Sequence, residues 1–354
     1  MKVKSKKAKV KISLISASLC LSGSLFVYAF EASPQWIKQT VNTTASFRGL
    51  SVVSEKVVWA SGTGGTVIRT IDGGKTWKVM IVPGAEKLDF RDIEAFDANT
   101  AYILSIGNGE SSRIYKTTNA GRTWKLQFKN DDPKKFFDAI TCVGRFECYA
   151  VSDPVQGIFP LLQTFDGGNH WYEASGSYMV KASLNEAAFA ASGTCLIREG
   201  QNLFFVTGGS AAKVYKLQIL SGDHGIDSPP GVSAPIVSGN PGSGIFSISM
   251  FDAKKGVIVG GNYEKPDEAK DNLAFTSDGG RTWQLGTGLS GYRSAVTYID
   301  EKTIIAVGTN GTDVSSDSGK TWKKIGSEDL NAVAAKGKNA VWAVGPKGMV
   351  AKLK

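Results

Sequence analysis

The sequence predicts an all-β protein, a seven-bladed β-propeller of four-stranded blades that is closed by its own N-terminal strand. Three observations support this prediction: a glycine-rich and proline-poor composition, a turn motif repeated five times, and short apolar segments that recur upstream of those turns. Glycine accounts for 41 of the 354 residues and proline for only 11. Abundant glycine supplies the positive φ angles of tight turns, and many tight turns imply many short strands.

The repeated motif spans eight residues, from a Thr or Ser to a Trp. Its copies lie at residues 70–77, 117–124, 164–171, 276–283 and 315–322. Its third position holds Asp72, Asn119, Asp166, Asp278 and Asp317. This side chain can accept hydrogen bonds from amides of its own turn, and the Trp can pack on the neighbouring strand. We therefore expect each copy to join the third and fourth strands of one repeat.

Seven repeats follow from the segments that precede these turns. We expect their first strands at residues 47–52, 90–96, 137–142, 186–191, 246–251, 293–298 and 331–335. The fourth repeat lacks the turn motif, and its last strand is expected near residues 232–237. Groups of four short strands at such spacing are typical of β-propellers.

The two ends of the chain complement each other. The last repeat stops at Lys354, after its third strand. Residues 35–38 look like the Trp-bearing fourth strand of a repeat. We therefore expect the N-terminal strand to complete the last blade and close the ring.

The first 29 residues have the features of a secretory signal peptide. Six lysines lie between residues 2 and 11, an uncharged stretch covers residues 12–30, and small residues flank Tyr28 at the end of this stretch. We expect cleavage after Ala29, a propeller over residues 30–354, and a periplasmic or secreted protein. The alternative is an uncleaved leader, because 19 uncharged residues could just span a bilayer.

Charge, histidine and cysteine content narrow the function. Removing the six leader lysines reduces the net charge from +9 to +3, so basicity gives no support for a nucleic-acid partner. Two histidines and no dinucleotide-binding motif leave no expected metal or cofactor. In an oxidising compartment Cys142 and Cys148 could form a disulfide, with Cys195 left over; buried free thiols are the alternative.

The starts of the seven first strands align on polar residues. They are Arg48, Arg91, Asp138, Glu186, Ser247, Arg293 and Asn331. We expect them to ring the mouth of the central channel, on the face that carries the longer loops, where binding is usual. The three arginines could bind an anionic group or a carboxylate-bearing partner. A purely structural ring of ion pairs is the alternative.

The motif at Asp72-Gly-Gly-Lys-Thr-Trp77 resembles the Asp box of bacterial neuraminidase repeats. Together with residues 187–195, 244–247 and 291–294, it also resembles the photosystem II stability/assembly factor family and its bacterial relatives. This resemblance covers the chain after the leader. It implies a non-enzymatic, extracytoplasmic propeller that binds or assembles other proteins. We accordingly expect a protein or peptide partner in the cell envelope, no further membrane segment, and a monomer.

A sialidase-like glycosidase is the alternative function, because sialidases also carry Asp boxes. Such an enzyme needs an arginine triad, an acid and a tyrosine nucleophile assisted by a glutamate. Arg48, Arg91 and Arg293 with Asp138, Glu186 and Tyr292 supply these residue types. However, Tyr292 and Arg293 are adjacent on an expected strand, so their side chains should point to opposite sides. We therefore expect no catalytic residues.

Overall fold

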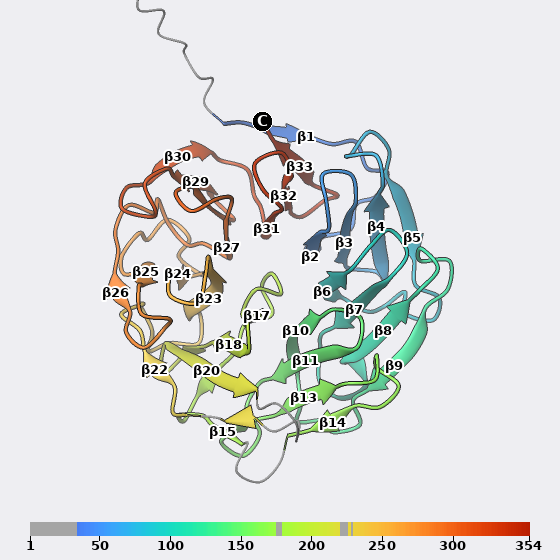
Figure 1. Cartoon of the computed structure of the whole chain (residues 1–354), viewed down its shortest axis with the longest axis horizontal. Coiled ribbons are helices and arrows are strands. Elements are labelled where there is room, and N and C mark those ends of the chain that lie inside the picture. The colour runs from blue at the N-terminus through green and yellow to red at the C-terminus, as the bar shows by residue number, and fades with distance from the viewer. Residues whose placement is uncertain (1–33, 175–178, 220–225, 228) are drawn as a thin grey trace, which may run out of the picture. The chain divides into compact units, whose positions relative to one another are not determined.

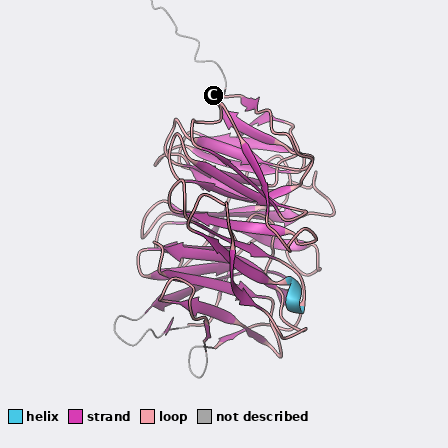
Figure 2. Cartoon of the chain, turned by 90° about the vertical axis from the view of Figure 1, so that its right-hand side faces the viewer, coloured by secondary structure: helices cyan, strands magenta, loops and turns pink. Residues whose placement is uncertain are grey.

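The computed structural model describes residues 34–174, 179–219, 226–227 and 229–354. These residues form a ring of seven antiparallel blades around a central axis (Figure 1). The side view shows strands almost throughout, with one 3-10 turn, η1 (Gly109–Ser111) (Figure 2). No helix in these described ranges is long and apolar enough to cross a membrane. The expected leader, residues 1–29, lies outside them.

Blade 1 contains β2 (Phe47–Val52), β3 (Val58–Gly62), β4 (Thr66–Thr70) and β5 (Lys78–Ile81), and blade 2 contains β6 (Phe90–Ala95), β7 (Ala101–Ser105), β8 (Arg113–Thr117) and β9 (Lys125–Lys129). Blade 3 contains β10 (Phe137–Val143), β11 (Glu147–Ser152), β13 (Leu161–Thr164) and β14 (Tyr172–Glu173). Blade 5 contains β23 (Ser243–Met250), β24 (Gly256–Asn262), β25 (Leu273–Thr276) and β26 (Gln284–Leu285), and blade 6 contains β27 (Ala295–Tyr298), β28 (Ile304–Gly308), β29 (Gly311–Ser315) and β30 (Lys323–Gly326).

Blade 7 confirms the predicted closure of the ring. It consists of β31 (Ala332–Ala335), β32 (Val341–Val344), β33 (Val350–Leu353) and the N-terminal β1 (Trp36–Lys38). Strand β1 pairs with β33, with Trp36 opposite Leu353. Backbone hydrogen bonds between Gln35 and Lys354 extend this pairing to the end of the chain. The first and last segments of the sequence thus share one sheet.

Blade 4 corrects one sequence-based expectation. Its inner strand is β17 (Leu196–Glu199), followed by β18 (Asn202–Val206) and β20 (Lys213–Ile219), and not residues 186–191. The short β21 (Ile226–Asp227) and β22 (Val232–Ser233) both pair with β20 in the outer position. Residues 186–187 instead form β16 (Glu186–Ala187), which pairs with β19 (Gly208–Gly209). A further small pair, β12 (Ile158–Phe159) with β15 (Val180–Lys181), lies outside the blades.

The repeated turns share one hydrogen-bond pattern. In the first copy the Thr70 hydroxyl donates to Asp72 Oδ1 (2.8 Å) and accepts from the Gly74 amide (3.0 Å). Both the amide (2.9 Å) and the hydroxyl (2.6 Å) of Thr76 donate to the Asp72 carboxylate. Equivalent bonds recur at Asp278 and Asp317. At Asn119 the side-chain amide donates to the hydroxyl of Thr123 instead.

Each repeated turn also bonds to the hairpin between the first and second strands of its own blade. The amide of Gly73 donates to the carbonyl of Lys56, and that of Gly167 to the carbonyl of Phe146. The same bond recurs in blades 2, 5 and 6, where the donors are Ala120, Gly279 and Ser318. The repeated turns and these hairpins therefore share one side of the ring, which we call the turn face.

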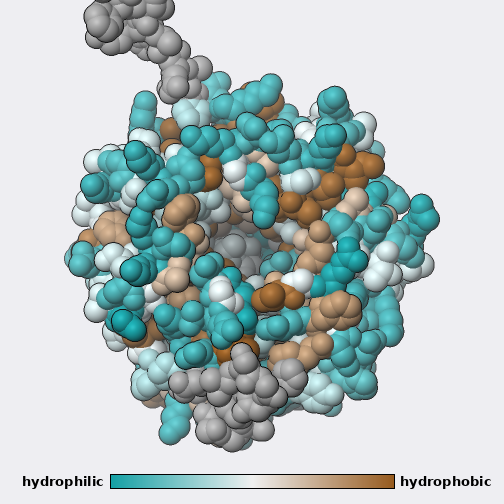
Figure 3. All heavy atoms as spheres, viewed as in Figure 1, coloured by the Kyte–Doolittle hydropathy of each residue, from teal (hydrophilic) through white to brown (hydrophobic). Residues whose placement is uncertain are grey.

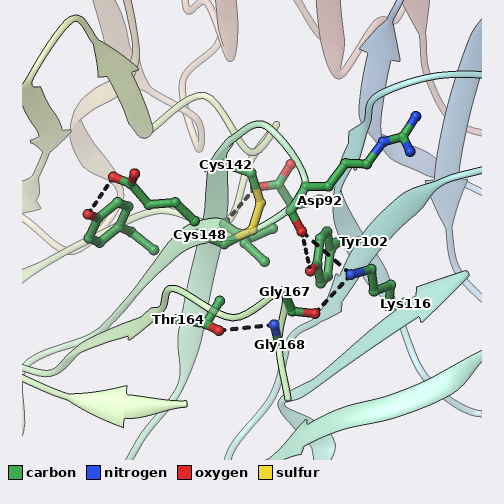
Figure 4. The surroundings of a disulfide bond; sticks show 12 residues. Asp92, Tyr102, Lys116, Cys142, Cys148, Thr164, Gly167 and Gly168 are labelled. Atoms are coloured by element: carbon green, nitrogen blue, oxygen red, sulfur yellow. Dashed lines mark hydrogen bonds between the residues drawn. A yellow bond between two sulfur atoms is a disulfide. The ribbon is translucent and has the colours of Figure 1, made fainter. Parts of the chain in front are cut away.

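The turns join neighbouring blades as well. Lys116 of blade 2 donates through Nζ to the carbonyl of Gly167 in the blade 3 turn (2.9 Å), beside the Tyr102 ring of blade 2 (Figure 4). The Tyr102 hydroxyl donates to the carbonyl of Arg145 in blade 3 (3.0 Å). A Cβ atom added at Gly168 would lie 3.2 Å from the Tyr102 ring, so an aromatic side chain of blade 2 packs closely against this glycine of blade 3.

Gly74 provides a test of this packing. A methyl group at Gly74 would overlap the ring of Trp342 in blade 7, whereas a methyl group at Gly84 would meet nothing within 4 Å. Both glycines have positive φ, 90° and 75°. Gly74→Ala should therefore lower the free energy of unfolding by about 2 kcal/mol more than Gly84→Ala, because only the former adds overpacking to backbone strain. Chemical denaturation checks this; equal losses would contradict it.

Candidate functional site

The centre of the ring is occupied by a loop that the sequence analysis assigned to a strand. Residues 188–194, which we call the channel loop, leave β16 and run into the middle of the ring before β17 begins (Figure 1). The loop contacts side chains or backbone of blades 1, 2, 3, 5 and 6. It therefore blocks the central channel.

Charged side chains hold the backbone of the channel loop. The amide of Ala188 donates to Asp153 Oδ1 (2.9 Å). On the other edge, Arg91 Nη1 donates to the carbonyl of Ala190 (3.2 Å) and Arg48 Nη1 to the carbonyl of Ala191 (2.9 Å). One carboxyl group thus accepts a hydrogen bond from a loop amide, and two guanidinium groups donate hydrogen bonds to loop carbonyls.

Hydroxyl groups and one aromatic stack fix the rest of the loop. Thr194 Oγ1 lies 2.6 Å from Ser247 Oγ, and the Ser192 hydroxyl donates to the carbonyl of Ser294 (2.9 Å). The Phe189 ring stacks on Phe246, with centroids 4.0 Å apart and an interplanar angle of 4°. These contacts anchor the loop to blades 5 and 6.

Above the channel loop lies a cavity of about 300 Å³, which we call the cup. Its floor is Ala190 and Ala191, and its walls are Arg48, Arg91, Phe189, Phe246, Tyr263, Tyr292, Ser294, Thr309 and Asn331. The space-filling view looks at the opposite side of the ring, whose middle is also hollowed (Figure 3). Arg48 and Arg91 lie at the starts of β2 and β6, and these strands end at the hairpins of the turn face. The cup therefore opens on the opposite side, which we call the cup face.

Arg48 and Arg91 differ in their counterions. Arg91 Nε is 2.7 Å from Asp89 Oδ2, an ion pair. Arg48 donates to the carbonyl of Ala191, and no carboxylate oxygen of the described residues lies within 4.0 Å of it. Burial, and next the nearby charge of Arg91, lower the pKa of Arg48. Arg48 is therefore a partly desolvated guanidinium that lies beside a second guanidinium and has no carboxylate partner of its own. Such a group is a site for an anion.

An aromatic wall faces these arginines. Phe246 makes edge-to-face contacts with Tyr263 and Tyr292, at centroid distances of 6.2 and 4.8 Å. Tyr292 is 4% exposed, and burial raises the pKa of its hydroxyl, so it is uncharged at neutral pH. The cup therefore pairs a cationic side with an apolar aromatic side.

Only three of the seven predicted mouth residues line the cup: Arg48, Arg91 and Asn331. Arg293 is fully buried in a salt bridge with Asp313 (2.5 Å), and it also donates to Asn310 Oδ1 and to the carbonyl of Tyr292. Its expected place at the mouth is wrong because residue 293 lies two positions before β27 begins. There its side chain turns towards Asp313 of β29 instead of towards the axis.

The other three residues are also buried elsewhere. Ser247 hydrogen-bonds to Thr194 of the channel loop, and Asp138 is 1% exposed. Glu186 accepts hydrogen bonds from Thr207 (2.6 Å) and Tyr215 (2.9 Å), with Lys213 Nζ 3.3 Å away. Glu186 misses the mouth because residues 186–191 are not the inner strand of blade 4. The expected ring of seven mouth residues is therefore not present.

Cys142 and Cys148 are joined by a disulfide across the blade 3 hairpin (Figure 4), whereas Cys195 is a buried free thiol. The sequence analysis missed the channel loop and the aromatic wall. One signal was available: residues 190–193 are Ala-Ala-Ser-Gly, side chains too small to form the apolar core of a blade. In addition, Gly208 and Gly244 leave the space that the Phe189 ring fills.

Comparison with known proteins shows the fold. No family model and no curated protein sequence matches the chain. A solved structure of YCF48 bound to D1 peptide is 16% identical, with a TM-score of 0.63 over 90% of this chain and 95% of that one. YCF48 from Cyanidioschyzon merolae has the same identity and TM-score over 89% and 98%. The WD40 propeller domain of Doa1 is 10% identical, with a TM-score of 0.60 over 91% and 97%.

The carboxyl groups around the channel loop should make stability depend on pH. Burial raises the pKa of Asp92 to about 7 and that of Asp153 to about 6. Near pH 4–7 the folded protein keeps the Asp92 proton, which the unfolded chain releases. The free energy of unfolding should therefore fall as pH rises through this window, by up to about 1.4 kcal/mol per pH unit for this group. Denaturation of Asp92→Asn should show a shallower slope; an unchanged slope would contradict the assignment.

Replacing Arg293 should destabilise the fold. Arg293→Ala leaves the Asp313 carboxylate buried without a counterion, which typically costs about 3–5 kcal/mol. The matched control is Arg281→Ala. Because Arg281 is exposed, this change should lower the free energy of unfolding by less than about 0.5 kcal/mol. Urea denaturation measures both, and a small loss for Arg293→Ala would show that the pair is dispensable.

Proposed function

We propose that this chain is a non-enzymatic scaffold that binds a segment of a protein partner in the cup, through an acidic group on that partner. The observation that carries the proposal is the state of Arg48, a largely buried guanidinium. Its neighbour Arg91 forms an ion pair with a carboxylate, whereas Arg48 has no carboxylate partner among the described residues. A carboxylate from a partner would supply the missing charge and could accept two parallel hydrogen bonds.

The remaining walls suit a peptide side chain. Phe246, Tyr263 and Tyr292 form an apolar surface opposite the arginines, and Asn331 and Thr309 add polar groups to the walls. A volume of about 300 Å³ is at the lower end of the range for ligand pockets, about 300–1,000 Å³. This volume suits one or two side chains of an extended segment.

A solved relative in fold supports a peptide as the partner class. YCF48, whose propeller resembles this one at a TM-score of 0.63, has a structure bound to D1 peptide. At 16% identity the likeness concerns the fold, so the choice of partner depends on the chemistry of this cup.

An extracytoplasmic location is part of the proposal. The leader sequence, in which six lysines precede an uncharged stretch, supports export, and the disulfide between Cys142 and Cys148 suits an oxidising compartment. A partner in the cell envelope follows from that location. The protein is proposed to act as a monomer, in which each ring presents one cup.

The geometry gives no support to the sialidase-like alternative. Its arginine triad would need Arg293 beside Arg48 and Arg91, but Arg293 is buried against Asp313. Its glutamate would need to assist Tyr292, but Glu186 bonds to Thr207 and Tyr215 instead. The residues for that mechanism are therefore not brought together.

Removing both cup arginines should abolish binding without unfolding the ring. Peptides selected from a random library against the purified protein should be rich in Asp or Glu. Their affinity, measured by fluorescence anisotropy, should fall at least tenfold for the Arg48→Ala, Arg91→Ala double variant, because a desolvated charge pair is worth a few kcal/mol.

The matched control is the Lys75→Ala, Arg122→Ala double variant on the turn face, which should bind the selected peptide as the unmodified protein does. Changing the acidic residue of the peptide to its amide should reproduce the loss seen with the cup variant. The proposal fails if the cup variant binds unchanged, or if the protein hydrolyses a sialoside.

A further inference from the structure

The turn face carries a repeated set of cations that the fold does not use. The sixth of the eight residues in each repeated turn is a cation in four copies, namely Lys75, Arg122, Arg281 and Lys320. In the third copy it is Asn169. All five side chains are exposed. The hydrogen bonds that define the turn come from the Thr, Asp and Gly positions. A cation is therefore not required for turn geometry.

Charges nearer the axis on this face are paired between neighbouring blades. Arg145 of blade 3 bonds to Asp97 of blade 2, Lys255 of blade 5 to Glu301 of blade 6 (2.5 Å), and Lys338 of blade 7 to Asp300 of blade 6 (3.1 Å). These pairs belong to the hairpins between first and second strands.

The four turn cations, which we call the outer cations, lack such pairing. None has a carboxylate oxygen of the described residues within 4.0 Å. The nearest acid in the first turn, Asp72, directs both carboxylate oxygens to Thr70 and Thr76. The outer cations therefore face solvent as a set distributed around the ring.

Apolar side chains project on the same face. Phe146, in the hairpin of blade 3, is 66% exposed, and Ile71, in the first repeated turn, is 52% exposed. Phe146 follows Cys142 and precedes Cys148, so the disulfide tethers the base of its hairpin. Exposed aromatic and aliphatic groups among cations are typical of surfaces that lie on membranes.

The chain also enters the propeller on the turn face. Strand β33 leads away from the cup face and pairs with β1 in antiparallel register, so β1 starts at the turn face. Residues 1–33 include the uncharged stretch assigned above to membrane export or anchoring. The first described residues, which follow this stretch in the sequence, thus begin at the same face as the outer cations.

We propose that the turn face docks on the surface of an anionic lipid bilayer, where the outer cations contact headgroups and Phe146 and Ile71 enter the interface. Lipid is favoured over nucleic acid because the cations are spread over four blades with apolar residues among them, instead of lining a groove. Each Lys or Arg near an anionic surface adds to the attraction, and salt weakens it. The proposal is independent of the cup.

Vesicle binding tests the proposal. All core clusters and the strand that closes the ring lie after residue 33, so residues 34–354 can be used without the lysine-rich leader. We expect this protein to cosediment with vesicles of phosphatidylglycerol and phosphatidylcholine, but not with pure phosphatidylcholine. Replacing Lys75, Arg122, Arg281 and Lys320 by Gln should weaken the partition coefficient at least tenfold.

The matched control replaces four exposed lysines of the cup face, Lys87, Lys134, Lys270 and Lys347, by Gln, and it should bind vesicles within twofold of the unmodified protein. Circular dichroism verifies that both variants fold. Phe146→Ser should weaken vesicle binding most clearly at high salt. Salt screens the attraction between the cations and the headgroups, so the remaining binding depends on the apolar side chains that enter the interface. The proposal is overturned if the unmodified protein does not bind anionic vesicles, whether or not it binds nucleic acid. It is also overturned if both quadruple variants lose the same amount of vesicle binding.

Discussion

The structure depends on how the channel loop is held. Inner strands that converge on one axis leave a central space, and here a backbone segment fills it. One amide of this segment donates to Asp153, and two of its carbonyls accept from Arg48 and Arg91. Buried charges are costly unless they are paired and hydrogen-bonded. The loop therefore satisfies buried side chains and also makes a floor. Without that floor the centre would be an open channel instead of a cup.

The repeated turns perform a second, separate task. Their Thr, Asp and Gly positions build a local hydrogen-bond pattern, and in four of the five turns a glycine packs against an aromatic side chain of the neighbouring blade. Because these positions fix the geometry, the exposed position between them is free to vary. The two faces can then differ in chemistry: a cup with one unpaired guanidinium on one side, and a distributed set of cations on the other.

The sequence predicted what local patterns determine. The turns, the sevenfold repeat and the closure by residues 35–38 all follow from motifs that repeat, and the structure has them. The mouth residues were predicted by aligning the starts of the first strands. The predicted positions were wrong where a blade departs from the repeat. Arg293 is aligned with Arg48 in sequence, but its partner Asp313 comes from a distant strand. The channel loop has no counterpart in the other blades, so no alignment among them could reveal it.

The most direct test of the cup is a crystal structure of the protein with a selected acidic peptide. The account predicts a peptide carboxylate within hydrogen-bond distance of the Arg48 guanidinium, with a neighbouring apolar side chain against Phe246 and Tyr292. A peptide bound along a blade edge or on the turn face, with no acidic group near Arg48, would contradict it.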